Sequence, residues 1–298
     1  MFDYILGNEP LKTYLKRALE ENRLPQTLLF TGDSGIGKAL FARALAALIL
    51  KSEKSPDLHV LKPEGKSGLY AIDTLREMMD KEHSAPFESP GKVFILEDVE
   101  RMQPASANAL LKTLEEPSPD TTFILLSSNI QEMLSTILSR CSVLHFQPLT
   151  EQDISTLLQA KGHPTHLAKL SHGSAGRAFE LAEHPELENQ RKILFKLLCE
   201  KPSYPERVLQ LQKLEELVME GKEEDPVRVG KKIEQLFAFV LMWHRDQHAR
   251  KLGIQDLFFP DEPFCEPTPL VEVEKAIEKG RLAFQRNIKL SICLQTLF

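Results

Sequence analysis

Two patterns of apolar residues, one typical of strands and the other of helices, alternate along the first half of the chain. Predominantly apolar runs occur at 26–31, 92–96, 123–127 and 143–146, and a weaker one at 59–61, which predicts five strands. Between these runs, apolar residues recur at helical spacing, so helices are expected at 11–22, 38–51, 71–81 and 106–116, with a helix end at 136–140. Strands that alternate with helices indicate a mostly parallel sheet covered on both faces.

The pattern changes at Pro148. Thr150 precedes a run that begins with acidic residues, so it is the expected N-cap of a helix. From there to Phe298 the sequence contains no convincing strand, and helical signals recur as far as a last one at 268–295. The Pro-rich and aromatic stretch 253–267 is expected to be an ordered loop packed on helices. The sequence therefore predicts an α/β domain followed by all-helical regions.

The segment 31–39, TGDSGIGKA, has the form of a phosphate-binding loop between a strand and a helix. Its glycines, Gly32, Gly35 and Gly37, let backbone N–H groups turn toward a phosphate, and Lys38 can reach the terminal phosphates. Ala39 stands where the complete motif has Ser or Thr, so no hydroxyl is available for magnesium. The loop indicates P-loop ancestry, and its retention as structure alone stays open.

A second nucleotide-site motif is suggested by four apolar residues followed by Glu97 and Asp98. Active P-loop ATPases carry Asp and then Glu here, to hold magnesium and to polarise the attacking water. The reversed order moves each carboxylate by about one methylene, and phosphoryl transfer depends on positioning. Together with Ala39, this predicts weak or absent hydrolysis. Ser127-Ser128-Asn129 ends the next strand, where a polar residue could orient water, bind the terminal phosphate or simply cap the strand end.

Composition narrows the class of protein. The 298 residues include 37 Lys+Arg and 43 Asp+Glu, for a net charge of −6, which argues against a stand-alone nucleic-acid binder. The cysteines, at 141, 199, 265 and 293, form no C-x-x-C pair, so no zinc site is expected. With so few thiols in a chain of this length, a reducing cytoplasm is the simplest setting. The N-terminus is not a signal peptide, and no apolar stretch is long enough for a membrane span.

The run 106–117, SANALLKTLEEP, followed by Ser139-Arg140-Cys141, resembles the bacterial DNA polymerase III clamp-loader subunits, which are AAA+ ATPases. The likeness covers residues 1–180 well and the helical remainder loosely. Within this family the chain most resembles the delta-prime type. Motor subunits of the gamma/tau type normally keep an intact phosphate loop, the Asp-Glu pair and a four-cysteine zinc module. Many delta-prime subunits also carry that module, so its absence departs from both types.

The resemblance implies roles for particular residues. Arg140 would be an arginine finger, offered in trans to ATP held by a neighbouring motor subunit, and the alternative is a surface salt bridge. Asn129 corresponds to the first sensor position. Arg177 falls near the second sensor region, where helix capping or a surface charge is an equal alternative. The remaining nucleotide-binding positions would be vestigial, and weak ATP or ADP binding is left open.

The resemblance also implies a division into three parts and a function. Residues 1–148 would form the AAA+ α/β domain, 149–185 a small helical lid, and 186–298 a helical collar for oligomerisation. The chain would be the stator of the clamp loader, assembling with gamma/tau and delta subunits and reaching the sliding clamp and primer–template DNA through the assembly. A gamma/tau-type ATPase motor is the alternative, kept open by Lys38. An ATP-driven helicase or remodelling enzyme on the same fold is disfavoured by the 112–117 and 139–141 motifs.

Overall fold

The computed structural model describes residues 2, 4–63, 69–219 and 226–298. It divides into two compact units, Met1–Ala182 and Glu183–Phe298. The first holds a five-stranded sheet followed by short helices, and the second contains only helices and loops in its described residues. The predicted fold class, a P-loop α/β domain followed by helical regions, is confirmed. The finer division of the first unit at residue 148 stays a prediction.

The sheet consists of five parallel strands in the order β2-β3-β4-β1-β5. The predicted strands are all present, and their bounds are β1 Thr27–Thr31, β2 Leu58–Leu61, β3 Lys92–Leu96, β4 Thr121–Ser127 and β5 Ser142–His145. β1, β3 and β4 are almost wholly buried, as expected for apolar strands covered on both faces. Placing β1 beside β4 brings the segment after β1 next to the end of the central strand at the carboxyl edge, where ligands of open α/β sheets bind.

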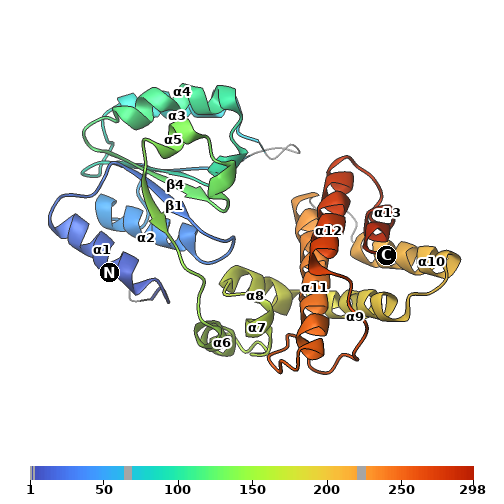
Figure 1. Cartoon of the computed structure of the whole chain (residues 1–298). Helices are drawn as coiled ribbons and strands as arrows, with labels where there is room; N and C mark the ends of the chain where they lie inside the picture. Colours follow the sequence, from blue (N-terminus) through green and yellow to red (C-terminus); the bar gives the residue numbers. More distant parts are fainter. Residues whose placement is uncertain (1, 3, 64–68, 220–225) are drawn as a thin grey trace. The chain divides into compact units, whose positions relative to one another are not determined.

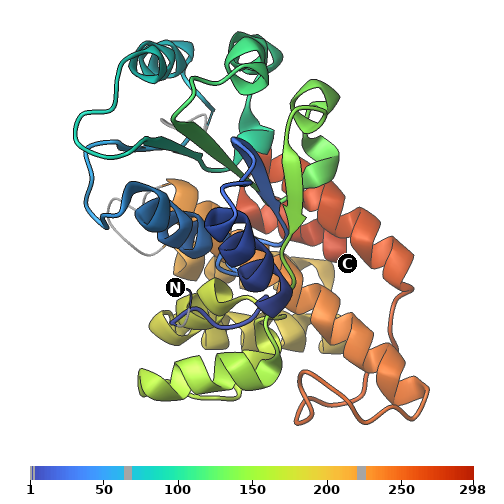
Figure 2. The same cartoon turned by 90° about the vertical axis from the view of Figure 1, so that its left-hand side faces the viewer.

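Helices cover both faces of this sheet (Figure 1, Figure 2). α1 (Glu9–Glu20) and α2 (Lys38–Leu50) bury apolar side chains against one face, together with Phe30 of β1. α3 (Ile72–His83), α4 (Pro104–Glu115) and α5 (Ser135–Leu138) cover the other face, together with Leu29. Alternate residues of β1 therefore enter two different cores, which is the period of two that a strand imposes.

The segment predicted to form the lid contains α6 (Glu151–Ala160), α7 (Leu167–Leu170) and α8 (Ala175–Glu183), and we keep the name lid for it. Thr150 is the N-cap of α6, as predicted: its hydroxyl accepts from the Asp153 amide, and the Asp153 carboxylate accepts from the Thr150 amide. The α4 helix begins at Pro104, two residues earlier than expected from its apolar pattern, because proline is well suited to the first helical position.

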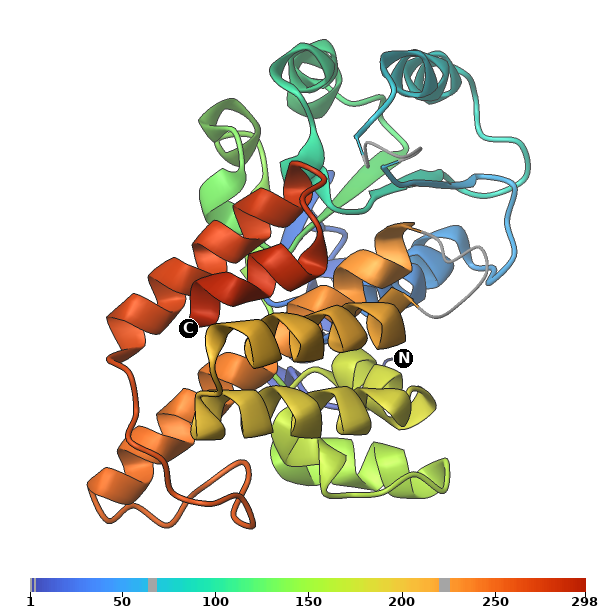
Figure 3. The ribbon, with the colours of Figure 1, turned by 90° about the vertical axis from the view of Figure 1, so that its right-hand side faces the viewer.

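The second unit packs α9 (Glu186–Glu200), α10 (Tyr204–Met219), α11 (Pro226–Lys251), α12 (Leu270–Gln285) and α13 (Leu290–Leu294) (Figure 3). α11 contacts α9, α10 and α12, and Trp243 from α11 lies against Phe195 from α9. The prediction of one helix over 268–295 is wrong. The α12 helix ends at Gln285 because Asn287 adopts a left-handed conformation with φ 59°, after which the chain turns into α13.

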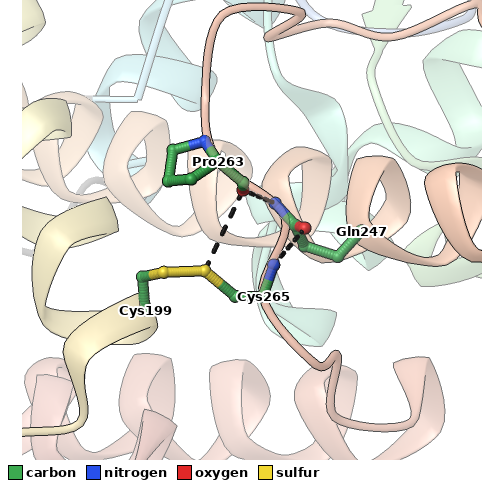
Figure 4. The surroundings of a disulfide bond; sticks show 4 residues. All are labelled: Cys199, Gln247, Pro263 and Cys265. Atoms are coloured by element: carbon green, nitrogen blue, oxygen red, sulfur yellow. Dashed lines mark hydrogen bonds between the residues drawn. A yellow bond between two sulfur atoms is a disulfide. The ribbon is translucent and has the colours of Figure 1, made fainter.

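The stretch between α11 and α12 is the ordered loop that the sequence predicted. The Asp246 carboxylate accepts from the Phe259 amide at 2.7 Å, and Gln247 bonds to Pro263 and Cys265. A disulfide joins Cys265 to Cys199 of α9, with 5.6 Å between their Cα atoms (Figure 4). The loop is thus tied to both α11 and α9. The scattered cysteine spacing gave no signal of this pairing, and a disulfide is not what the expected reducing cytoplasm favours.

No helix among the described residues is both long enough and apolar enough to cross a membrane. Within the same residues, no group of three His, Cys, Asp or Glu side chains is placed to hold a metal ion.

Candidate functional site

The phosphate loop connects β1 to α2, as the sequence predicted. Gly32, Gly35 and Gly37 all adopt positive φ, and Gly37 is the N-cap of α2. Gly35 is a position that requires glycine: its φ is +77°, and a Cβ there would lie 2.4 Å from Ser174 Oγ. Three of the predicted binding residues therefore lie together at the carboxyl edge of the sheet.

Lys38 stands at the start of α2 and is 8% exposed. Its ammonium group donates to the carbonyl of Gly32 at 2.5 Å and to that of Asp33 at 2.7 Å. Burial lowers the pKa of Lys38, and the carboxylates of Glu100, Asp98 and Asp33 oppose that shift. The lysine thus satisfies two carbonyl groups of its own loop, and binding a phosphate would require exchange of these bonds.

Ala39 follows Lys38 and packs against the hydrophobic core beneath α2. It brings no oxygen to the loop. The position that carries a magnesium-binding hydroxyl in the complete motif is therefore part of the packing here.

The acidic segment at the end of β3 is divided between different partners. Glu97 pairs with Arg43 at 3.1 Å and with Lys62 at 2.9 Å, one cation on each carboxylate oxygen. Asp98 follows in a left-handed conformation with φ 52°. Burial raises the pKa of Asp98, and the carboxylates of Glu100 and Glu97 raise it further, against the opposing effect of Arg101 and Lys38. Of the predicted pair, Glu97 is held in ion pairs and Asp98 is the carboxylate electrostatically coupled to Lys38.

Glu100 and Ser128 also belong to this region, although the sequence assigned neither of them a role of its own. Glu100 accepts from the backbone N–H of Ser128 at 3.0 Å and from its hydroxyl, which joins the segment after β3 to the end of β4. Asn129, the predicted sensor, bonds to the Gln131 amide and to Glu132 at 2.7 Å. The signal for Ser128 was its place at the end of an apolar strand, the same signal that pointed to Asn129.

The lid is bonded directly to the phosphate loop. The Ser174 hydroxyl donates to the Ser34 carbonyl at 2.9 Å, and the Gly176 amide donates to the Gly35 carbonyl at 2.9 Å. The Arg177 amide donates to the same Ser174 oxygen at 3.1 Å. A Cβ on Gly176 would lie 3.0 Å from Gly35 Cα, so the two glycines allow a close backbone approach. We call these contacts the loop–lid latch.

Arg140 occupies a separate place, between α5 and β5. Its Nε and Nη2 donate to Glu115 Oε2 at 3.1 and 3.0 Å. Its Nη1 donates to the Thr136 carbonyl at 2.9 Å and to the Ser139 hydroxyl at 3.3 Å. The side chain is 28% exposed. Among the described residues, none of these partners belongs to the phosphate loop. The predicted site residues therefore lie in two separate places, at the phosphate loop and around Arg140.

The sequence is similar to subunits of DNA polymerase III. Residues 7–150 match the family described as DNA polymerase III, delta subunit. The chain is 33% identical over 205 residues to DNA polymerase III subunit delta′ of Bacillus subtilis, which covers 61% of each protein. It is 30% identical over 210 residues to the gamma subunit of Buchnera aphidicola, which covers 61% of this chain and 58% of the relative. The match thus spans less than two thirds of the length of either relative.

A solved structure shares the fold over most of the chain. A gamma subunit-related protein of DNA polymerase III from Thermotoga maritima superposes with a TM-score of 0.50, at 20% identity, covering 95% of this chain and 96% of the other. The resemblance to DNA polymerase III clamp-loader subunits and to their AAA+ fold is confirmed. Delta′ and gamma relatives match at similar identity, so these matches do not separate the two types.

Proposed function

We propose, starting from the match of residues 7–150 to the DNA polymerase III delta-subunit family, that this chain is a delta-prime-type subunit of a clamp loader. It acts as a stator that assembles with gamma/tau and delta subunits in the cytoplasm and helps to load the sliding clamp onto primed DNA. Its own nucleotide site does not turn over ATP. It supplies Arg140 in trans to the ATP site of a neighbouring subunit.

The observation that carries the stator proposal is the state of the phosphate loop. Lys38 bonds to the carbonyls of Gly32 and Asp33, and Ser174 of the lid bonds to Ser34. Each of these bonds competes with the reorganisation that phosphate binding requires. Ala39 adds a chemical reason, since without a hydroxyl at this position one protein ligand of magnesium is missing.

The acidic segment supports the same proposal. Glu97 stands where an active site holds the magnesium-binding Asp, and its carboxylate is already neutralised by Arg43 and Lys62. A carboxylate in two ion pairs is a poor ligand for a further cation, because both of its oxygens are engaged. We therefore assign the segment a structural role in this chain.

Arg140 is suited to the complementary role. A guanidinium is permanently charged and planar, and an arginine supplied to a phosphoryl-transfer site accelerates the reaction by about 10³- to 10⁵-fold in known systems. Arg140 is partly exposed on the first unit, so a neighbouring subunit could reach it. The net charge of −6 agrees with a chain that contacts other proteins and reaches DNA through the assembly.

The second candidate is a gamma/tau-type ATPase motor of the same loader. Two observations favour it: Lys38 is intact, and a gamma subunit is 30% identical to this chain. The two candidates differ in whether the isolated chain hydrolyses ATP.

The test is nucleotide binding and hydrolysis by the purified chain, with and without magnesium. The variant Lys38→Ala supplies the matched control for contaminating ATPases, because it removes the cation that any genuine activity of this loop would need. The stator proposal predicts that wild type and Lys38→Ala release phosphate at the same background rate. Magnesium-dependent turnover that Lys38→Ala abolishes would establish the motor instead.

A further inference from the structure

We propose that Glu115 is a positioning residue for Arg140, which it holds in the orientation required to reach a neighbouring ATP site. This inference rests on the proposed function, since it concerns how the finger is presented. It joins two segments that lie apart in the sequence, the 106–117 run and Ser139-Arg140-Cys141.

The geometry around Arg140 carries the inference. Four hydrogen bonds engage its guanidinium: two to Glu115 Oε2, one to the Thr136 carbonyl and one to the Ser139 hydroxyl. These involve Nε, both N–H groups of Nη1 and one of Nη2. One N–H of Nη2 has no partner in the part of the chain that the structure describes. The plane of the guanidinium is thus fixed while part of it remains free for a ligand.

Glu115 stands on a rigid support. It is the last residue of α4, and its two predecessors, Thr113 and Leu114, are 7% and 2% exposed. The Leu114 carbonyl accepts a hydrogen bond from the buried hydroxyl of Thr27 in β1 at 3.2 Å, which ties the end of α4 to the sheet. The domain core therefore holds the Glu115 carboxylate in place, and its hydrogen bonds fix the position of Arg140 relative to that core.

A second observation, independent of the hydrogen bonds, concerns the helix itself. The C-terminus of a helix carries partial negative charge, so a cation is favoured in its last turn and a carboxylate is disfavoured. Glu115 therefore occupies a position that the local helix electrostatics oppose. The cationic partner Arg140 compensates for that cost, which is the arrangement expected if the carboxylate is present to hold the arginine.

The physical benefit is preorganisation. An arginine side chain loses considerable rotamer freedom when it engages a phosphate, and a finger ordered in advance pays less of that cost in the transition state. Glu115 is 58% exposed, so the pair is screened by solvent and its effect on folding is small. Its effect on turnover is therefore separable from any effect on stability.

The experiment uses a reconstituted clamp loader in which only this chain is varied, with DNA-stimulated ATP hydrolysis as the readout. The variants are Glu115→Ala, Glu115→Gln, Arg140→Ala and the double variant Glu115→Ala/Arg140→Ala. Glu116→Ala is the matched control, because Glu116 is the next residue, is exposed and has no ion pair within the described residues. Gel filtration establishes that each variant enters the complex.

We expect Glu115→Ala to lower kcat, and the decrease should be at least about half of the decrease that Arg140→Ala causes. The KM for ATP should stay within about twofold of the wild-type value. Glu115→Gln keeps an acceptor oxygen and should lose less than Glu115→Ala. Glu116→Ala should match wild type. In the Arg140→Ala background, Glu115→Ala should have no further effect, because the residue through which it acts is gone.

Two failures are distinguishable. If Arg140→Ala leaves kcat unchanged, the arginine-finger proposal fails, and the inference fails with it. If Arg140→Ala lowers kcat but Glu115→Ala does not, only the inference is overturned. An equal loss from Glu115→Ala in both backgrounds also overturns it, as does a rise in kcat, which would mean that Glu115 restrains the arginine.

Discussion

The loop–lid latch makes a quantitative prediction about Gly35 and Ser174. In Gly35→Ala, a residue with a side chain is forced into φ +77°, which costs about 1 kcal/mol, and its Cβ meets Ser174 Oγ at 2.4 Å, an overlap that costs about 1–3 kcal/mol to relieve. The expected loss of stability in the latch is about 3 kcal/mol in total.

Ser174→Ala removes the other side of the contact. It deletes the hydrogen bonds to the Ser34 carbonyl and from the Arg177 amide, worth about 1 kcal/mol each. In the double variant the steric overlap is gone, because the next atoms near the Gly35 Cβ are Gly176 Cα at 3.3 Å and Arg177 N at 3.5 Å. The stability that the double variant loses should therefore be about 2 kcal/mol smaller than the sum of the two single losses.

The assay is native-state hydrogen exchange at the Gly176 and Arg177 amides, which bond to the phosphate loop and to Ser174. Gly37→Ala is the matched control: its φ is +102°, but nothing lies within 4 Å of its Cβ, so it carries backbone strain without the lid contact. It should leave the lid amides protected. Equal loss of lid protection in Gly35→Ala and Gly37→Ala, or strict additivity of Gly35→Ala with Ser174→Ala, would refute the reasoning.

Three further predictions concern groups outside the latch. The Cys199–Cys265 disulfide closes 66 residues of chain, so its reduction should lower the free energy of unfolding of the second unit by about 4 kcal/mol in denaturant titrations. Cys199→Ser should abolish the response to reductant, and a persistent response would contradict this. Burial alone would raise the pKa of Asp57, but three backbone N–H donors outweigh it and lower the pKa to about 2. The resulting stabilisation of about 2 kcal/mol is present above about pH 4 and lost as the pH falls toward 2. The difference in unfolding free energy between wild type and Asp57→Asn should shrink over that range, and a constant difference would contradict the assignment. Burial raises the pKa of the Cys141 thiol to about 12, so native protein should leave it unalkylated by iodoacetamide at about pH 8, as mass spectrometry would reveal.

The sequence predicted the local features of the first unit well. β1, β3 and β4 were found because a strand buried on both faces is a nearly continuous apolar run, as residues 93–96 illustrate. Thr150 was identified as an N-cap because capping depends on residues three apart in sequence. The phosphate loop was found for the same reason: its chemistry is carried by consecutive residues.

The contacts that define the site could not be predicted in this way. Ser34 and Ser174 are 140 residues apart, and Arg140 is 25 residues from Glu115. Such pairs form because the packed sheet and helices bring distant segments together, and no periodicity records them. The error in the last helix had a local signal, since Asn287 is a residue type that tolerates the left-handed conformation that ends a helix.

In the proposed function this chain contributes an arginine to another subunit's ATP site and has weak or absent hydrolysis of its own. The most direct measurement is DNA-stimulated ATP turnover of a reconstituted loader carrying Arg140→Ala in this chain. The matched control is Arg76→Ala, which removes an exposed arginine paired with Asp73. The account predicts that turnover falls with Arg140→Ala and is unchanged with Arg76→Ala. Full turnover by an intact complex that carries Arg140→Ala would contradict it.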